Sequence, residues 1–86
     1  MKLSEALARL RSAGVPDWFY ATNGELGTGD CIGIEHADGQ WSVYYSERGS
    51  KSPLESYTDE DSAAQAFLRR VAEAYRYSGR GIVPGV

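Results

Sequence analysis

The nine residues WSVYYSERG, at positions 41–49, constrain the fold of this chain more than any other stretch. Apolar and polar side chains alternate along them, a period of two that predicts a β-strand running into a polar turn. Trp41, Val43 and Tyr45 share one face of this strand, which can belong to a core. Tyr44 lies on the opposite face, where we expect an exposed aromatic side chain.

The turn after this strand carries Glu47 and Arg48, two charges of opposite sign beside Tyr44. An exposed aromatic ring next to paired charges is typical of protein-recognition surfaces. We therefore expect Tyr44, Glu47 and Arg48 to contact a protein partner. The alternative is that Tyr44 only packs across the sheet against a neighbouring strand and that Glu47 and Arg48 hold the turn.

Two amphipathic helices are predicted to bracket the chain. The first should run from about Ser4, its expected cap, to Ala13, before Gly14 and Pro16 end it. The second should begin at Thr58 or Asp59, where acidic residues suit the positive end of a helix dipole. The apolar stripes expected to be buried are Leu3, Ala6, Leu7 and Leu10 in the first helix, and Ala64, Phe67, Leu68, Val71 and Tyr75 in the second.

The segment between the helices alternates with period two and is divided by turn residues. Four strands are expected, at Trp18–Ala21, Cys31–His36, Gln40–Ser46 and Leu54–Tyr57. The second and third should form a hairpin across the turn ADG. The predicted class is α+β, in the order α-β-β-β-β-α: a four-stranded antiparallel meander with both helices on one face and the other face open to a partner.

A chain of 86 residues is expected to form one domain, residues 1–86, with 78–86 as a flexible tail. The single cysteine, Cys31, cannot form an internal disulfide, and the sequence has no second thiol or histidine cluster that could bind a metal ion together with it. Neither a signal peptide nor a membrane-spanning segment is visible, so a cytoplasmic protein without cofactor or metal is expected.

Charge is uneven along the chain. Residues 16–40 carry five acidic side chains and no Lys or Arg. An acidic surface repels phosphate backbones, which argues against nucleic-acid binding, and it favours a basic protein partner. We expect Glu25, Asp30 and Asp38 to steer such a partner. The alternative is that these acids only keep the surface soluble.

The order of GVPDWFYATNGEL, a short hairpin and QWSVYYSERGSKSPLESYTDEDSAAQAFLRRV resembles a family of small bacterial immunity proteins of polymorphic toxin systems. The resemblance covers roughly residues 7–71. Its most specific part is W-x-V-Y-Y-S-E-R-G, followed by the acidic helix start at 59–61 and A-x-x-F at 64–67. It implies a non-enzymatic protein that binds a cognate toxin domain stoichiometrically and blocks it. It does not transfer the identity of the toxin or any binding residue.

Two other functions remain open on the residues alone. One is a small adaptor that associates with itself through the outer face of the sheet. The other is a ribonuclease-like enzyme using His36, Glu47 and Arg48 as acid, base and phosphate clamp. His36 and Glu47 should lie at opposite ends of the hairpin, about 20–25 Å apart, so the enzyme is the weaker alternative.

Overall fold

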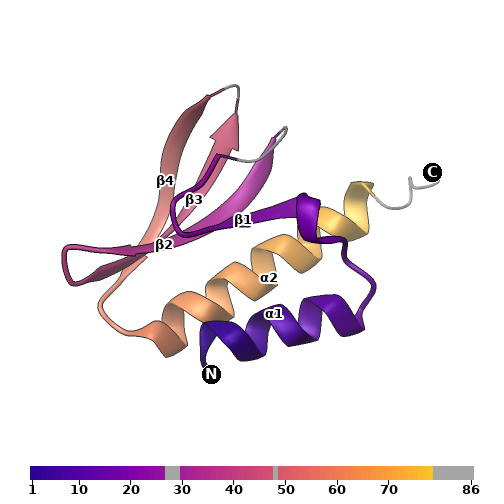
Figure 1. The fold of residues 1–86 in the computed structure, drawn as a ribbon, viewed down its shortest axis with the longest axis horizontal. Helices are drawn as coiled ribbons and strands as arrows, with labels where there is room; N and C mark the ends of the chain where they lie inside the picture. The colour runs from indigo at the N-terminus through magenta and orange to yellow at the C-terminus, as the bar shows by residue number, and fades with distance from the viewer. Residues whose placement is uncertain (27–29, 48, 79–86) are drawn as a thin grey trace.

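The computed structural model describes residues 1–26, 30–47 and 49–78 (Figure 1). The chain has the expected α+β composition, with a helix at each end and four strands between them. The elements are α1 (Leu3–Ser12), the short 3-10 helix η1 (Asp17–Phe19), β1 (Tyr20–Thr22), β2 (Cys31–Ala37), β3 (Gln40–Glu47), β4 (Ser50–Tyr57) and α2 (Glu60–Ser78).

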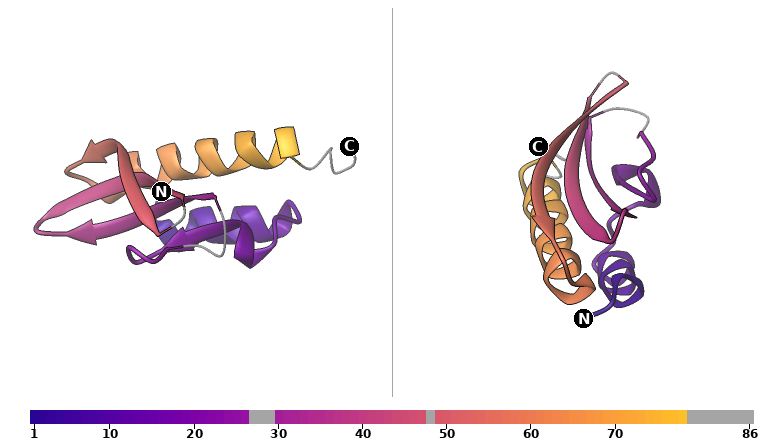
Figure 2. Two further views of the ribbon diagram at one scale, coloured as in Figure 1. Left: turned by 90° about the horizontal axis from the view of Figure 1, so that it is seen from above. Right: turned by 90° about the vertical axis from the view of Figure 1, so that its left-hand side faces the viewer.

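The two helices lie side by side and run in the same direction (Figure 1). At one end, the backbone N–H of Leu3 donates to Glu60 at 2.8 Å. At the other end, the Tyr75 hydroxyl donates to the carbonyl of Gly14 at 3.4 Å. Figure 2 shows α2 along one face of the sheet with α1 next to it.

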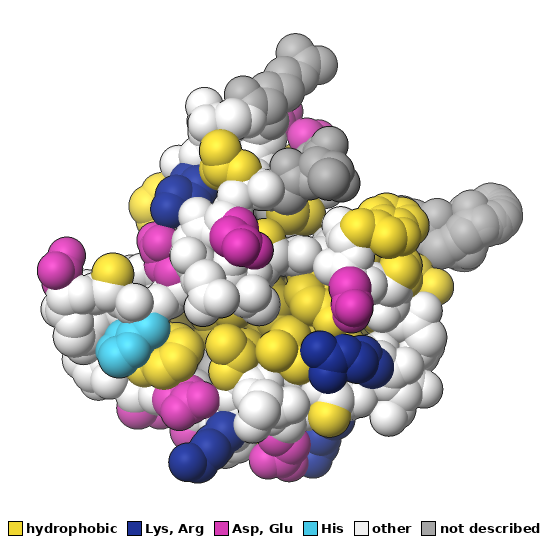
Figure 3. Space-filling model, in the orientation of Figure 1, with side chains coloured by type: hydrophobic (Ala, Val, Ile, Leu, Met, Phe, Trp, Pro, Cys, Tyr) yellow, Lys and Arg dark blue, Asp and Glu magenta, His cyan; other side chains and the backbone are white. Residues whose placement is uncertain are grey.

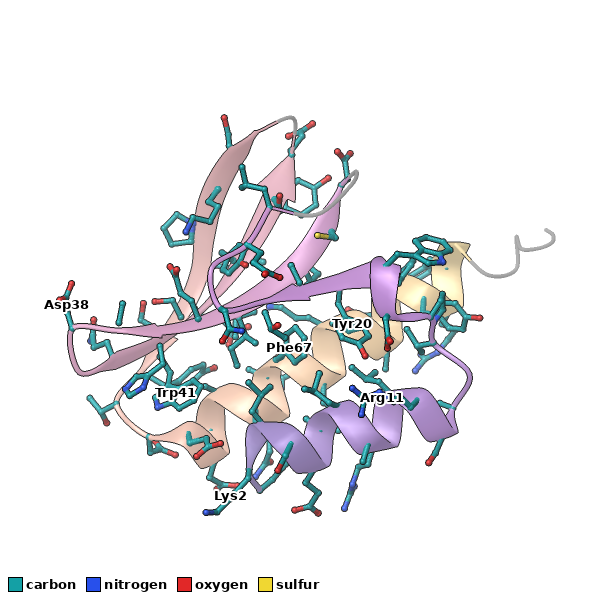
Figure 4. The ribbon with its side chains drawn as sticks, viewed as in Figure 1. Lys2, Arg11, Tyr20, Asp38, Trp41 and Phe67 are labelled. Carbon is teal, nitrogen blue, oxygen red and sulfur yellow. The ribbon has the colours of Figure 1, made fainter. Side chains whose placement is uncertain are left out.

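The core lies between this helix pair and the sheet, with Phe67 of α2 at its centre (Figure 4). Phe67 is fully buried and meets the ring of Tyr20 edge-to-face at 5.8 Å. Leu10 of α1 packs into the same cluster as Ile34 and Val43 of the sheet. The apolar stripes expected of both helices are confirmed, since every one of their members is buried or partly buried.

The helix N-termini are capped by carboxylates, but not in the way expected for α1. Ser4 is not a cap: α1 begins at Leu3, and the preceding Lys2 makes no side-chain capping bond. Glu60 of the neighbouring helix accepts the Leu3 N–H instead. In α2 the expected Asp59 cap is confirmed, because its carboxylate accepts the N–H of Ser62 at 2.7 Å. Hydrogen bonds from both the backbone and the side chain of Ser62 lower the pKa of Asp59.

The expected hairpin is confirmed as β2 and β3, with Ala37 opposite Gln40. The two turn residues, Asp38 and Gly39, have φ of 54° and 76°. Positive φ at both positions is the mark of a type I′ turn, whose twist matches that of the flanking strands, and Asp-Gly is among the pairs that adopt it most readily. Asp38 therefore stands at the exposed tip of the hairpin (Figure 4).

The sheet is mixed, so the prediction of a purely antiparallel meander was wrong. Its strand order is β1-β2-β3-β4, but β1 pairs with β2 in parallel, Tyr20 opposite Ile32. A tight turn can join only antiparallel neighbours, whereas parallel neighbours need a connection that crosses the sheet. The glycine-rich residues 23–30 were expected to form a turn, and strands joined by a turn are antiparallel. The predicted direction of β1 was wrong for this reason.

The outer strands also differ in length from the prediction. Trp18 and Phe19 belong to η1 rather than to a strand, and β1 begins at Tyr20. The last strand starts at Ser50, earlier than the expected Leu54, and includes Pro53. Proline lacks the N–H of a ladder residue but is tolerated in an edge strand such as β4. At the C-terminus, residue 78 still belongs to α2, and the rest of the expected tail, 79–86, lies outside the described residues.

The shared capping of α1 and α2 can be tested with Glu60. We expect Glu60→Ala to lower the free energy of unfolding by about 0.5–2 kcal/mol, because the N–H of Leu3 loses its acceptor. Glu60→Gln keeps an oxygen acceptor and should lose less. Glu73→Ala, an exposed acid of the same helix, should stay within about 0.5 kcal/mol of the parent. Urea unfolding measures all three, and equal losses for Glu60→Ala and Glu73→Ala would contradict the capping role.

Candidate functional site

The expected anchor Tyr44 is not exposed. Its side chain has 1% relative exposure and lies over Gly33 of the neighbouring strand. A Cβ at Gly33 would come within 2.2 Å of the Tyr44 ring, so only glycine leaves room for it. The assignment of Tyr44 to the face opposite Val43 was correct, but the expectation that this side chain is available to a partner was wrong.

Tyr44 is buried because the connection after β1 crosses the outer face at this point. The Tyr44 hydroxyl donates to the carbonyl of Glu25 at 2.6 Å. Lys51 of β4 donates to the carbonyl of Gly24 at 3.2 Å and to Glu35 at 3.1 Å, with its ammonium 5.2 Å from the centre of the Tyr44 ring. Burial, followed by the charge of Glu35, raises the pKa of Tyr44 to about 12. This arrangement fastens the connection and makes Tyr44 structural.

The four expected acidic contact residues are all exposed, but they do not form one patch. Asp30 and Glu47 lie at the same end of the sheet, because their chain neighbours Cys31 and Ser46 are paired across β2 and β3. Asp38 stands at the opposite end of β2, about 20–25 Å along the strand. Glu25 lies in the connection over Tyr44. The remaining expected contact residue, Arg48, lies outside the described residues.

The residues of the ribonuclease alternative are not brought together. His36 stacks on Trp41 with ring centroids 4.3 Å apart and 5° between the planes. Trp41 is its cross-strand neighbour, and Glu47 lies six residues further along β3. The expected separation of His36 from Glu47 is therefore confirmed.

The described residues contain neither a cluster of metal ligands nor a helix that could cross a membrane. Within 1–26, 30–47 and 49–78, three or more metal-ligating side chains do not gather at any point. Over the same ranges, neither helix has the length and apolar character that crossing a membrane requires. The candidate site therefore has to come from the shape and chemistry of the surface.

The most prominent feature of that surface is Trp18, whose side chain is 68% exposed. Helix η1 holds it at the end of the molecule where α2 finishes. Phe19 supports it: the Phe19 ring meets Trp18 at 6.1 Å and Tyr75 of α2 at 5.2 Å, both edge-to-face. Figure 3 shows apolar side chains gathered over this end of the molecule. Exposing a large ring this fully while its neighbours are packed is typical of an interaction surface.

Phe19, the residue after Trp18, lines a hollow of about 240 Å³, which we call the aromatic pocket. Its walls come from η1, the start of β2, the end of β3 and α2. Tyr77, 80% exposed, lies one turn beyond the Ala74 wall on the same face of α2. The residues that line the pocket are Phe19, Asp30, Cys31, Ile32, Tyr45 and Ala74.

Of the described residues that line the aromatic pocket, Asp30 is the one that carries a charge. It hydrogen-bonds the hydroxyl of Tyr45, and this bond raises the pKa of Tyr45, with burial and the charge of Glu47 adding to the effect. Two of the expected acidic residues, Asp30 and Glu47, thus lie next to an aromatic surface. The expectation from the sequence placed Glu47 beside Tyr44 and Asp30 among the acids that steer a partner.

A second hollow, of about 180 Å³, lies on the other side of η1 and is mostly polar. Arg11 approaches Asp17 there at 3.6 Å, and the hydroxyl of Tyr20 donates to Asp17 at 3.3 Å (Figure 4). Arg11 and Asp17 offset one another, which leaves Glu25 as the remaining charge among the described residues that line this hollow. Tyr20 is the one aromatic residue among them, so the hollow offers a partner less aromatic surface than the aromatic pocket does.

Comparison of the chain with protein-family models, with curated proteins and with solved structures finds no match. The aromatic pocket is therefore judged on its own geometry. The sequence contained one signal for η1, the helix that carries Trp18 and Phe19. Pro16 and Asp17 stand at its start, and proline and acidic residues are typical of the beginning of a helix.

The close fit of Tyr44 over Gly33 predicts strong coupling between the two positions. We expect Gly33→Ala to lower the free energy of unfolding by about 1–3 kcal/mol, because the new methyl group displaces a buried ring. In a Tyr44→Val background, where the ring is gone, the same substitution should cost almost nothing. Urea unfolding of the four proteins gives the coupling energy. Additive effects would show that Tyr44 does not occupy the space over Gly33.

The high pKa of Tyr44 predicts a loss of stability in alkali. The folded pKa of about 12 exceeds the ordinary value of 10.0. Between these values the unfolded chain loses the proton and the folded chain keeps it, so stability falls as the pH rises from 10 towards 12. Tyr44→Phe should make this fall shallower, whereas Tyr77→Phe, at an exposed position, should not. Urea unfolding over this range checks both variants, and parallel curves for parent and Tyr44→Phe would contradict the assignment.

Proposed function

We propose that this protein is an immunity protein, which binds a cognate bacterial toxin domain through the end that carries Trp18 and the aromatic pocket, and neutralises it by stoichiometric occlusion. The resemblance at residues 7–71 supplies the biological role. The observation that carries the binding site is the 68% exposure of Trp18 on a supporting ring of packed aromatics.

The edge-to-face contact with Phe19 supports a role in binding because it restricts the Trp18 ring on one side. A partner that covers a rigid ring gains its contact area with little loss of side-chain entropy. Tryptophan is also among the residues that most often dominate binding energy at interfaces. The surface therefore has an anchor that is prepared before the partner arrives.

The acidic residues around this end support a basic partner. Asp30 lines the aromatic pocket, and Glu47 lies at the same end of the sheet. Carboxylates at the rim of an interface speed association with a basic surface and discriminate against acidic ones. Asp38 lies at the far end of β2, and Glu25 lines the other hollow. Of the three acids expected to steer a partner, Asp30 therefore keeps this role, and Glu47 shares it.

The first experiment identifies the partner and its stoichiometry. The full chain serves as bait in the bacterium that produces it, and the captured protein is expressed alone to find whether it harms cells. Neutralisation of the purified toxin should saturate near a fixed molar ratio. Inactivation of the toxin by substoichiometric amounts over time would overturn occlusion, and a captured protein that does no harm would overturn the immunity role.

The second experiment tests the surface with two exposed apolar residues. Trp18→Ala should weaken binding by about 2 kcal/mol, roughly thirtyfold, with little change in thermal unfolding, since the ring contributes little to the core. Leu54→Ala is the matched control: Leu54 is 39% exposed but lies on β4. Calorimetric titration of both variants distinguishes the surfaces. Normal binding by Trp18→Ala would place the interface elsewhere.

A further inference from the structure

We infer that the aromatic pocket is the binding site for an arginine side chain of the protein partner. This inference rests on the proposed protein-binding role of this end of the molecule and adds the chemistry of what it recognises. It follows from the size of the pocket, the nature of its walls and the position of its one carboxylate.

The size of the pocket suits one long side chain. Its volume of about 240 Å³ is smaller than the roughly 300–1,000 Å³ of pockets that hold small-molecule ligands. A residue projecting from a partner needs less room, because its backbone stays outside. Phe19 lines the pocket and its ring also meets the ring of Trp18, so a partner that covers Trp18 can place a side chain in the pocket.

The walls suit the stem of an arginine. Phe19, Ile32 and Ala74 present carbon surface, and Tyr45 adds a second aromatic ring. The methylene groups of Arg cover such surfaces while the charged group stays near water. A guanidinium also stacks on aromatic faces, which the compact ammonium of Lys does less well.

Asp30 determines the charge of the occupant. Among the described residues that line the pocket, it is the only carboxylate and none is basic. A carboxylate has about four acceptor positions, and the bond to Tyr45 occupies one of them while holding the group in place. An apolar occupant such as Leu would take water away from Asp30 without replacing its hydrogen bonds. A guanidinium replaces them and pairs its charge.

Nuclear magnetic resonance of the full 86-residue chain tests this inference directly. The probes are acetyl-arginine amide, acetyl-citrulline amide, which has a similar shape without the charge, and acetyl-leucine amide. We expect the arginine probe to shift the amide signals of Ile32, Tyr45 and Ala74 in a saturable way at millimolar concentration, and the other two probes to bind more weakly. Equal or tighter binding of the leucine or citrulline probe, or no saturable shift at these residues, would overturn the inference.

Two matched variants test the role of the carboxylate. Asp30→Asn keeps an oxygen that can accept from Tyr45 but removes the charge, so we expect arginine binding to weaken about two- to fivefold, as for an exposed ion pair. Asp38→Asn removes the same charge at the far end of β2 and should leave binding unchanged. Equal effects of the two variants would show a general response to net charge and overturn the specific site.

The outcomes separate this inference from the proposed function. If a toxin is neutralised but the arginine probe does not bind the pocket, the immunity role stands and the stated occupant is wrong. If the probe binds the pocket but the captured partner is harmless, the pocket assignment stands and the immunity role is wrong.

Discussion

The parallel pairing of β1 with β2 is the constraint on which the rest of the structure depends. Because parallel neighbours cannot be joined by a tight turn, the chain between them has to pass over the sheet. Its described first part, residues 23–26, lies over the outer face, where the carbonyl of Glu25 accepts from Tyr44 and the carbonyl of Gly24 accepts from Lys51. The same pairing directs η1 to the end of the molecule near the last turns of α2. One strand direction thus covers the expected interface and exposes Trp18.

Local patterns predicted those parts of the fold whose contacts are close in sequence. Both helices follow from apolar stripes of period 3.6, and the hairpin follows from alternation around an Asp-Gly turn. The direction of β1 could not be predicted in the same way, because three residues carry no signal for parallel or antiparallel pairing. The capping of Leu3 by Glu60 could not be predicted for a related reason: the two residues are 57 positions apart, so no local pattern connects them.

The candidate site was predicted in part. Alternation correctly placed Tyr44 opposite Val43, but it specifies a face and not what covers that face. Gly33, directly across from Tyr44, was the one available hint that a large ring lies flat on the sheet there. Asp30 was selected for its charge, yet its neighbours Phe19, Tyr45 and Ala74 come from three other elements. Only the tertiary structure brings them together.

The side-by-side, same-direction packing of α1 and α2 gives the molecule an electrical polarity. Two positive helix ends meet near Glu60 and Asp61, and the last turns of both helices carry arginines, Arg9, Arg11 and Arg76. Aligned dipoles repel unless charges at each end offset them. Residues 59–61 therefore act as a counter-charge common to two helices, and α1 is stable in this orientation partly because of Glu60, an acid that belongs to α2. Reversing the sign of charge at this corner would press the helices apart at one end while leaving their apolar contacts intact.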